Sequence, residues 1–222
     1  NLFGSGNIDL GMLSIPITIF CVVGIMNAFN MIDGVNGLCA GCAMISLLLI
    51  GFHSGFIYDS MLVLIIGSMI GFLIFNLRIF GKKRGVFLGD SGSNLIGFWV
   101  AWCAIYCSQN TLYASEAITM IWFVAIPLLD CIGLIFARLH KGKSISSPGR
   151  DHIHHKLQAY LGSSFKALTF LCGMGVSLAS IGIIIEKTTQ SSEISLLIFL
   201  GVAACYYFGS NYISTKILTN NT

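Results

Sequence analysis

Charged side chains are scarce in this chain of 222 residues. They make up 9% of it, whereas 55% of the residues are hydrophobic and the mean hydropathy is +0.85. Between Leu10 and Leu77 the only formal charges are Asp33 and Asp59. A soluble domain carries roughly 25% charged residues, and a soluble fold of this size could not hide so much apolar surface. We therefore expect a membrane protein with the lipid bilayer as its solvent.

Linkers, repeats and paired cysteine motifs are also lacking. The chain has 3 prolines and no low-complexity stretch or repeat period, which predicts one integral membrane domain over residues 1–222. It begins at Asn1 without the basic segment and cleavage site of a signal peptide, so we expect none. All 8 cysteines lie in apolar segments. Cys39 and Cys42 have the spacing of a redox or zinc half-site, but no second pair accompanies them, and we interpret them as packing residues.

Long apolar runs predict an all-α, polytopic transmembrane bundle. A run of about 18 to 22 residues can cross roughly 30 Å of hydrocarbon, and about seven such runs can be drawn. The expected spans are Leu10–Ile32, Leu38–Phe56, Met61–Phe80, Ser91–Cys107, Ala117–Ala137, Ala167–Ile185 and Ile194–Ile213.

The basic residues are distributed unevenly between the two sides of these spans. Of the 12 Lys and Arg residues, all but Lys187 fall on one side, including those of a basic, histidine-containing loop at 138–166. The positive-inside rule makes that side cytoplasmic. The N-terminus is then outside and the C-terminus cytoplasmic. The net charge of +3 is modest, and we expect no nucleic-acid partner.

The first of three polar segments on the cytoplasmic side is NAFNMIDGVNGL, from Asn27 to Leu38. Asn27, Asn30 and Asp33 are three apart, so on a helix each is rotated by about 60° from the last and the three share a face. Asn36 follows between two glycines that permit a turn or a close ligand. The alternative is a polar helix exit with a glycine cap, although two amides and a carboxylate exceed what a cap needs.

The second segment is FLGDSGSN, from Phe87 to Asn94. Its carboxylate, Asp90, either caps the helix that follows or binds a ligand at that helix start. If Asp90 faces Asp33, the two carboxylates form an oxygen-rich pocket suited to Mg²⁺, with Mn²⁺ as the alternative ion.

The third segment gathers Arg150, Asp151, His152, His154 and His155. Dense polar clusters in an apolar chain are usually functional, and imidazolium and guanidinium groups bind phosphate. Zinc is the alternative, but it requires three or four ligands and no cysteine lies nearby.

Asp130 stands apart within the fifth expected span, where a charge is costly. We consider a role in a polar cavity and a buried structural hydrogen bond equally plausible.

These three segments, in this order and on one side, resemble those of the polyprenyl-phosphate N-acetylhexosamine-1-phosphate transferases (glycosyltransferase family 4), most closely their bacterial GlcNAc-type branch. The resemblance runs from about Asn7 to the end of the sixth span. It implies transfer of GlcNAc 1-phosphate from UDP-GlcNAc to undecaprenyl phosphate, with release of UMP. The reaction would take place at the cytoplasmic face of the bacterial inner membrane and begin O-antigen or common-antigen synthesis.

The resemblance also implies roles for individual residues. It makes Asp33 and Asp90 catalytic and metal-binding, and His152, His154 and His155 catalytic contacts of the sugar nucleotide. The expected substrate-binding residues are Asn27, Asn30, Asn36, Arg150 and Asp151.

The chain departs from the family pattern in two ways. Asn36 stands where the family has a second aspartate, which weakens activity if that position tunes the metal or a proton transfer, and changes little if it only forms a hydrogen bond. The family's paired-aspartate motif is also missing upstream of Asn27, so we expect about four N-terminal helices to be absent. The alternatives are a cation-coupled secondary transporter and an inactive truncated homologue. Association into a homo-oligomer is left open.

Overall fold

The computed structural model describes residues 10–113, 115–140, 142, 144 and 151–220. Over these residues the chain is helical, with short connections and no strand, which confirms the all-α prediction for the described part. The helices are α1 (Ser14–Ile32), α2 (Leu38–Ser54), α3 (Ser60–Asn76), α4 (Gly89–Gln109), α5 (Ala117–Phe123), α6 (Ala125–His140), α7 (Ile153–Leu161), α8 (Ser164–Thr189) and α9 (Ser192–Asn220), with 3₁₀ turns at Gly11–Leu13, Phe56–Tyr58 and Lys82–Arg84.

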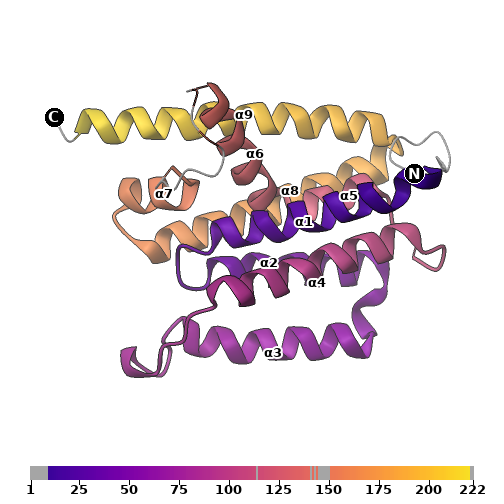
Figure 1. Ribbon diagram of the computed structural model, residues 1–222, viewed down its shortest axis with the longest axis horizontal. Coiled ribbons are helices and arrows are strands. Elements are labelled where there is room, and N and C mark those ends of the chain that lie inside the picture. Colours follow the sequence, from indigo (N-terminus) through magenta and orange to yellow (C-terminus); the bar gives the residue numbers. More distant parts are fainter. Residues whose placement is uncertain (1–9, 114, 141, 143, 145–150, 221–222) are drawn as a thin grey trace.

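Helix α2 forms the centre of the bundle. It contacts α1, α3, α4, α5 and α8, and its small and branched side chains such as Ala43, Leu47 and Ile50 are fully buried. The long helices run roughly side by side, with α3 and α9 at opposite edges (Figure 1). The turn between α1 and α2, the start of α4 and helix α7 therefore lie at the same end of the bundle, the left end in Figure 1.

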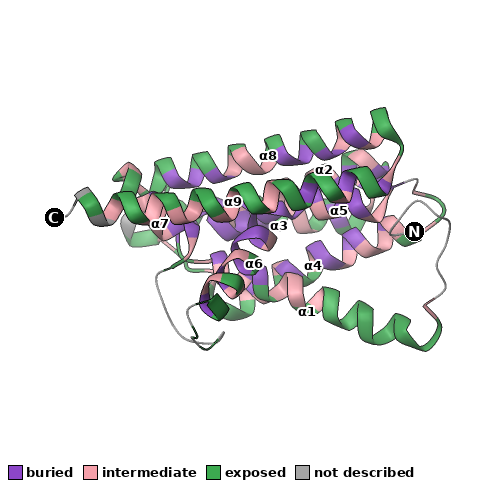
Figure 2. Cartoon of the chain, turned by 90° about the horizontal axis from the view of Figure 1, so that it is seen from above, coloured by how far each residue is buried: buried purple, intermediate pink, exposed green. Residues whose placement is uncertain are grey.

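The outer faces of the bundle are apolar. Side chains such as Ile15, Phe20, Leu64, Leu197 and Phe208 are exposed, and the outward sides of α1 and α9 are largely exposed (Figure 2). Apolar side chains on the outside and satisfied backbone groups inside helices are what a bilayer requires.

In the part of the chain that the structure describes, three helical segments are long and apolar enough to cross a membrane: Gly11–Ile32, Ser164–Thr189 and Ser192–Ile217. The pair α5 and α6 would add a fourth, and α2 and α3 are shorter apolar helices. Each of the seven predicted segments is helical, but by length and composition three or four of them qualify as spans.

The fifth predicted span, Ala117–Ala137, is not one continuous helix, which corrects the prediction. The chain bends by 83° between α5 and α6. Pro127 has no N–H and its ring crowds the carbonyl of Phe123 four residues earlier. That carbonyl instead accepts a hydrogen bond from Ser46 Oγ at 2.7 Å, so the carbonyl freed by Pro127 keeps a partner in the core.

The histidine segment is also not a plain loop. Helix α6 extends to His140, α7 begins at Ile153, and α8 follows after Gly162, whose φ of +67° ends α7. Helix α7 contacts α8 and α9. The sequence missed α7 because polar side chains mask its short apolar face, made by Ile153 and Leu157.

Candidate active site

The turn between α1 and α2 carries the first functional segment. Helix α1 ends at Ile32, and Gly37, with φ of +82°, starts α2 in a left-handed conformation that suits glycine. The N–H of Gly37 donates to Asn76 Oδ1, while Asn76 Nδ2 donates to Val86 O at 2.9 Å. Buried Asn76 thus ties this turn to the segment that leads into α4.

Asn30 and Asp90 meet across the α1–α4 contact. Asn30 Nδ2 donates to Asp90 Oδ1 at 3.2 Å and to Ser93 Oγ at 2.9 Å. Ser93 is fully buried one turn into α4. The amide therefore orients one oxygen of the Asp90 carboxylate, while the side chain of Asp90 remains exposed.

Asp33 lies within electrostatic range of Asp90. Asp33 is half-buried, and its pKa is raised first by burial and then by the negative charge of Asp90. A cation bound between the two carboxylates would offset this unfavourable interaction at Asp33. The two carboxylates therefore interact electrostatically at one end of the bundle.

The donor set suits a hard divalent cation better than zinc. Within the described ranges, no group of three or more His, Cys, Asp and Glu side chains could hold a metal ion, so this part of the chain forms no zinc site. Cys39 and Cys42 are buried in α2, in agreement with a packing role. Mg²⁺ commonly uses one or two carboxylates and completes its shell with water and phosphate, which is the number that Asp33 and Asp90 supply.

His154 reaches the same turn from α7. Its imidazole lies against Gly34, in the space that a side chain there would fill. It is 1% exposed, and neither ring nitrogen has a hydrogen-bond partner among the described residues. Burial, then the nearby His155, lowers its pKa to about 4. A buried imidazole without partners requires an explanation, and an incoming ligand would provide one.

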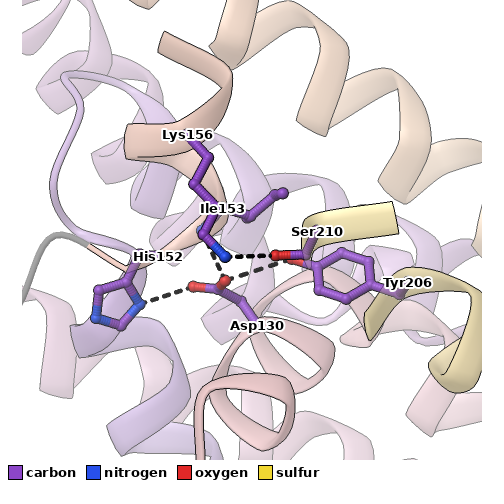
Figure 3. A network of polar contacts seen from close by, with 6 residues as sticks. All are labelled: Asp130, His152, Ile153, Lys156, Tyr206 and Ser210. Carbon is purple, nitrogen blue, oxygen red and sulfur yellow. Dashed lines mark hydrogen bonds and ion pairs between the residues drawn. The ribbon is translucent and has the colours of Figure 1, made fainter. Parts of the chain in front are cut away.

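His152 is held by a residue that the sequence left unassigned (Figure 3). Its Nδ1 lies 2.9 Å from Asp130 Oδ2, and the backbone N–H of Ile153 donates to Asp130 Oδ1 at 2.9 Å. Tyr206 in α9 donates to the same oxygen at 3.4 Å. Asp130 is 4% exposed, so the structure contains the buried hydrogen bond that was one of its two expected roles.

His155 lies on another face of α7. It lines a cleft of about 1010 Å³ between α6, α7 and α9, together with Asp130, Asp151 and Lys156. The rings of His154 and His155 are nonetheless 4.2 Å apart, and those of His152 and His154 are stacked at 5.5 Å. The three imidazoles are contiguous, but they do not all face the carboxylates.

The remaining predicted residues are less closely placed. Asn27 is exposed one turn before Asn30, Asn36 is half-buried in the α1–α2 turn, and Asp151 is exposed. Arg150 lies outside the described residues. Sequence reasoning missed Asn76 and Ser93, and it gave Asp130 no partner.

The sequence is similar to known enzymes. Residues 1–108 match the model of a family described as glycosyl transferase family 4. The chain is 34% identical over 210 residues to the undecaprenyl-phosphate alpha-N-acetylglucosaminyl 1-phosphate transferase of Escherichia coli O157:H7. The alignment covers 93% of this chain and 57% of that protein. Proteins of the same name from Yersinia pestis (35% over 203 residues, 89% and 56%) and Haemophilus influenzae (37% over 123 residues, 55% and 35%) are also similar.

The chain thus spans little more than half the length of the first two relatives. The similarity nevertheless extends over both polar segments of the carboxylate site, and in the first two relatives the aligned length is about nine tenths of this chain. The chain belongs to glycosyl transferase family 4.

Proposed function

We propose that the complete protein transfers N-acetylglucosamine 1-phosphate from UDP-GlcNAc to undecaprenyl phosphate and releases UMP. The names of the relatives support the acceptor lipid and the sugar. The observation that carries the proposal is the convergence of Asp33, Asp90 and His154 at one end of an apolar bundle. Such a place can receive a polar nucleotide from water and a lipid from the bilayer.

The reaction brings two anions together. An oxygen of the lipid phosphate attacks the β-phosphorus of UDP-GlcNAc, the bond from that phosphorus to the bridging oxygen breaks, and UMP leaves with that oxygen. A phosphate monoester has a second pKa of about 6, so the nucleophile is largely ionised at neutral pH. Catalysis then depends mainly on positioning and on neutralising charge.

The residues of the site would divide these tasks. Asp33 and Asp90 would hold Mg²⁺, which when bound neutralises charge on the diphosphate. Asn30 fixes the rotamer of Asp90. His152 and His154 lie where their ring nitrogens could contact phosphate oxygens or the sugar, and Lys83 and Arg84, exposed just before α4, would attract the nucleotide.

The membrane arrangement is part of the proposal. The site end carries the basic segments, so the positive-inside rule makes it cytoplasmic in the inner membrane. In this arrangement the shorter helices α2 and α3, together with α4, complete seven crossings. The product would enter cell-surface polysaccharide synthesis.

The test uses membranes that contain the complete protein. With UDP-GlcNAc, undecaprenyl phosphate and Mg²⁺, we expect UMP and a lipid-linked sugar diphosphate in equal amounts, and we expect a chelator to stop both. Asp90→Asn should abolish turnover. The matched control is Asp59→Asn, because Asp59 caps α3 at the other end of the bundle. Full turnover in Asp90→Asn would remove Asp90 from the metal site, and no UMP from the wild type would refute the proposal.

A secondary transporter finds less support in the geometry. Transport through the bundle needs polar groups near its middle, whereas Asp33 and Asp90 lie at helix ends and Asp130 is engaged by His152 and Ile153. Substrate flux into proteoliposomes without a lipid-linked product would reverse this preference.

A further inference from the structure

Asp130 is a buried carboxylate that joins the histidine segment to the rest of the bundle. It projects from α6, just after the break, and receives contacts from the N-terminus of α7 and from α9 (Figure 3). The proposed function gives this residue no part, although a carboxylate with 4% exposure is costly to retain without one.

The two oxygens of Asp130 have different partners. Oδ1 accepts from the N–H of Ile153 and from the hydroxyl of Tyr206. Ile153 is the first residue of α7, so its N–H has no partner within the helix. This oxygen therefore anchors the start of α7 to α6, and the negative charge suits a helix N-terminus.

Oδ2 has a chemical consequence as well. An ionised carboxylate can only accept hydrogen bonds, so with Asp130 ionised the 2.9 Å contact requires a proton on Nδ1 of His152. The hydrogen bond made by one ring nitrogen determines the state of the other. In Figure 3 the second ring nitrogen of His152 points away from Asp130. The stacked ring of His154 connects this imidazole to Gly34 and the carboxylate end of α1.

We propose that Asp130 is a positioning residue for sugar-phosphate transfer: it fixes the proton of His152 on Nδ1, so that Nε2 carries no proton and accepts a hydrogen bond from a hydroxyl of the sugar nucleotide. This inference rests on the proposed function, because it assigns His152 a contact with the substrate. Asp130 itself touches no substrate and acts through the imidazole. A carboxylate that holds an imidazole in one tautomer has the same task in serine proteases.

The two tasks of Asp130 can be separated by one substitution. In Asp130→Asn the amide oxygen can still accept from Ile153 N–H, so the anchor of α7 is kept. The amide NH₂ now faces Nδ1 and donates to it, which moves the imidazole proton to Nε2. A residue that only caps α7 should tolerate this change, whereas a residue that sets the tautomer should not.

The first measurement is the tautomer of His152 in lipid nanodiscs. The complete protein is labelled with ¹⁵N-histidine, and the His152 signals are identified by their loss in His152→Gln. We expect a proton on Nδ1 in the wild type and on Nε2 alone in Asp130→Asn. A wild-type imidazole protonated on Nε2 alone would overturn the inference, even if the Asn variant failed to fold.

The second measurement is steady-state kinetics. We expect kcat of Asp130→Asn to fall by about 100-fold or more, with KM for UDP-GlcNAc changed less than about threefold. Combining Asp130→Asn with His152→Gln should cost nothing beyond His152→Gln alone, because the two residues act in series. Asp59→Asn, the same exchange at another helix start, should keep the wild-type kcat.

The outcomes separate the two proposals. Suppose that the wild type is active, that the proton of His152 has moved in Asp130→Asn, and that kcat of this variant is still within threefold of the wild type. This result would refute the positioning role and leave the proposed function intact. Losses that add in the double variant would also refute it, because they would indicate a structural role. If the wild type forms no UMP, the proposed function fails, and the tautomer measurement alone decides where Asp130 places the proton.

Discussion

The imidazole of His154 occupies the space in which a side chain at Gly34 would begin. An ideal Cβ at Gly34 would collide with Nε2 of His154, although the two residues come from opposite halves of the chain. His154 cannot retreat easily, because it is buried and packed against the rings of His152 and His155. The missing side chain at Gly34 therefore brings the histidine helix next to the carboxylates.

The first prediction concerns this contact. Gly34→Ala should displace the His154 ring and lower kcat by about 10- to 100-fold, since small misplacements in an active site are costly. Gly24→Ala in α1 is the matched control, because a Cβ at Gly24 meets nothing within 4 Å. The measurement is UMP formation, with melting temperatures to show that both variants fold. Equal activity in the two variants would contradict the close approach of α7.

The polar segments could be located from the sequence because they interrupt an apolar background. The common side of the membrane predicts that Asp33 and Asp90 are close, and in the structure the charge of Asp90 acts on Asp33. The partner of His152 could not be found in this way. Asp130 reaches it only because Pro127 bends the chain between α5 and α6, and the direction of a bend is set by packing rather than by local pattern. The role of Asn76 could not be predicted for a similar reason, because in the sequence it is only a polar residue at the end of an apolar helix.

The second prediction tests how Asp90 is oriented. Asn30→Ala removes the donor to Asp90 Oδ1 and Ser93 Oγ. A hydrogen bond to a charged group contributes about 1.5–3 kcal/mol, so the Mg²⁺ concentration for half-maximal activity should rise about tenfold or more. Asn27→Ala, the same change one turn earlier on an exposed position, should have the smaller effect. Equal effects would show that the loss of any amide side chain on this face of α1 has the same consequence, and that the contact of Asn30 with Asp90 is not the cause.

A third prediction addresses Asn76, which links the α1–α2 turn to the segment before α4. Asn76→Asp keeps an acceptor for the N–H of Gly37 but sets a carboxylate oxygen against the carbonyl of Val86. A buried group left without its partner costs about 1–3 kcal/mol, so the melting temperature and kcat should both fall. Asn110→Asp is the control, since the side chain of the half-buried Asn110 accepts a hydrogen bond from Leu112 N–H in the opposite turn. A stable, fully active Asn76→Asp variant would mean that this bridge does not position the site.

The fourth prediction is a pH dependence of stability that originates from His154. Its pKa is lowered to about 4 by burial and by the neighbouring histidines, whereas an unfolded histidine titrates near 6.5. Between these values the unfolded chain binds a proton that the folded chain does not, so stability should decrease as pH falls from about 6.5 to 4, by roughly 3 kcal/mol in all. The raised pKa of Asp33 acts in the opposite direction, because its proton is held more tightly when folded.

His154→Gln separates these two contributions. It removes the titrating imidazole but leaves Asp33 in place, so the loss of melting temperature between pH 6.5 and 4 should be smaller than in the wild type. His140→Gln, which removes an exposed imidazole at the end of α6, is the matched control. If the wild type and His154→Gln lose melting temperature equally over this range, His154 is not the buried neutral base that the structure describes. The structure would then give no reason to expect a ligand that donates a hydrogen bond to His154.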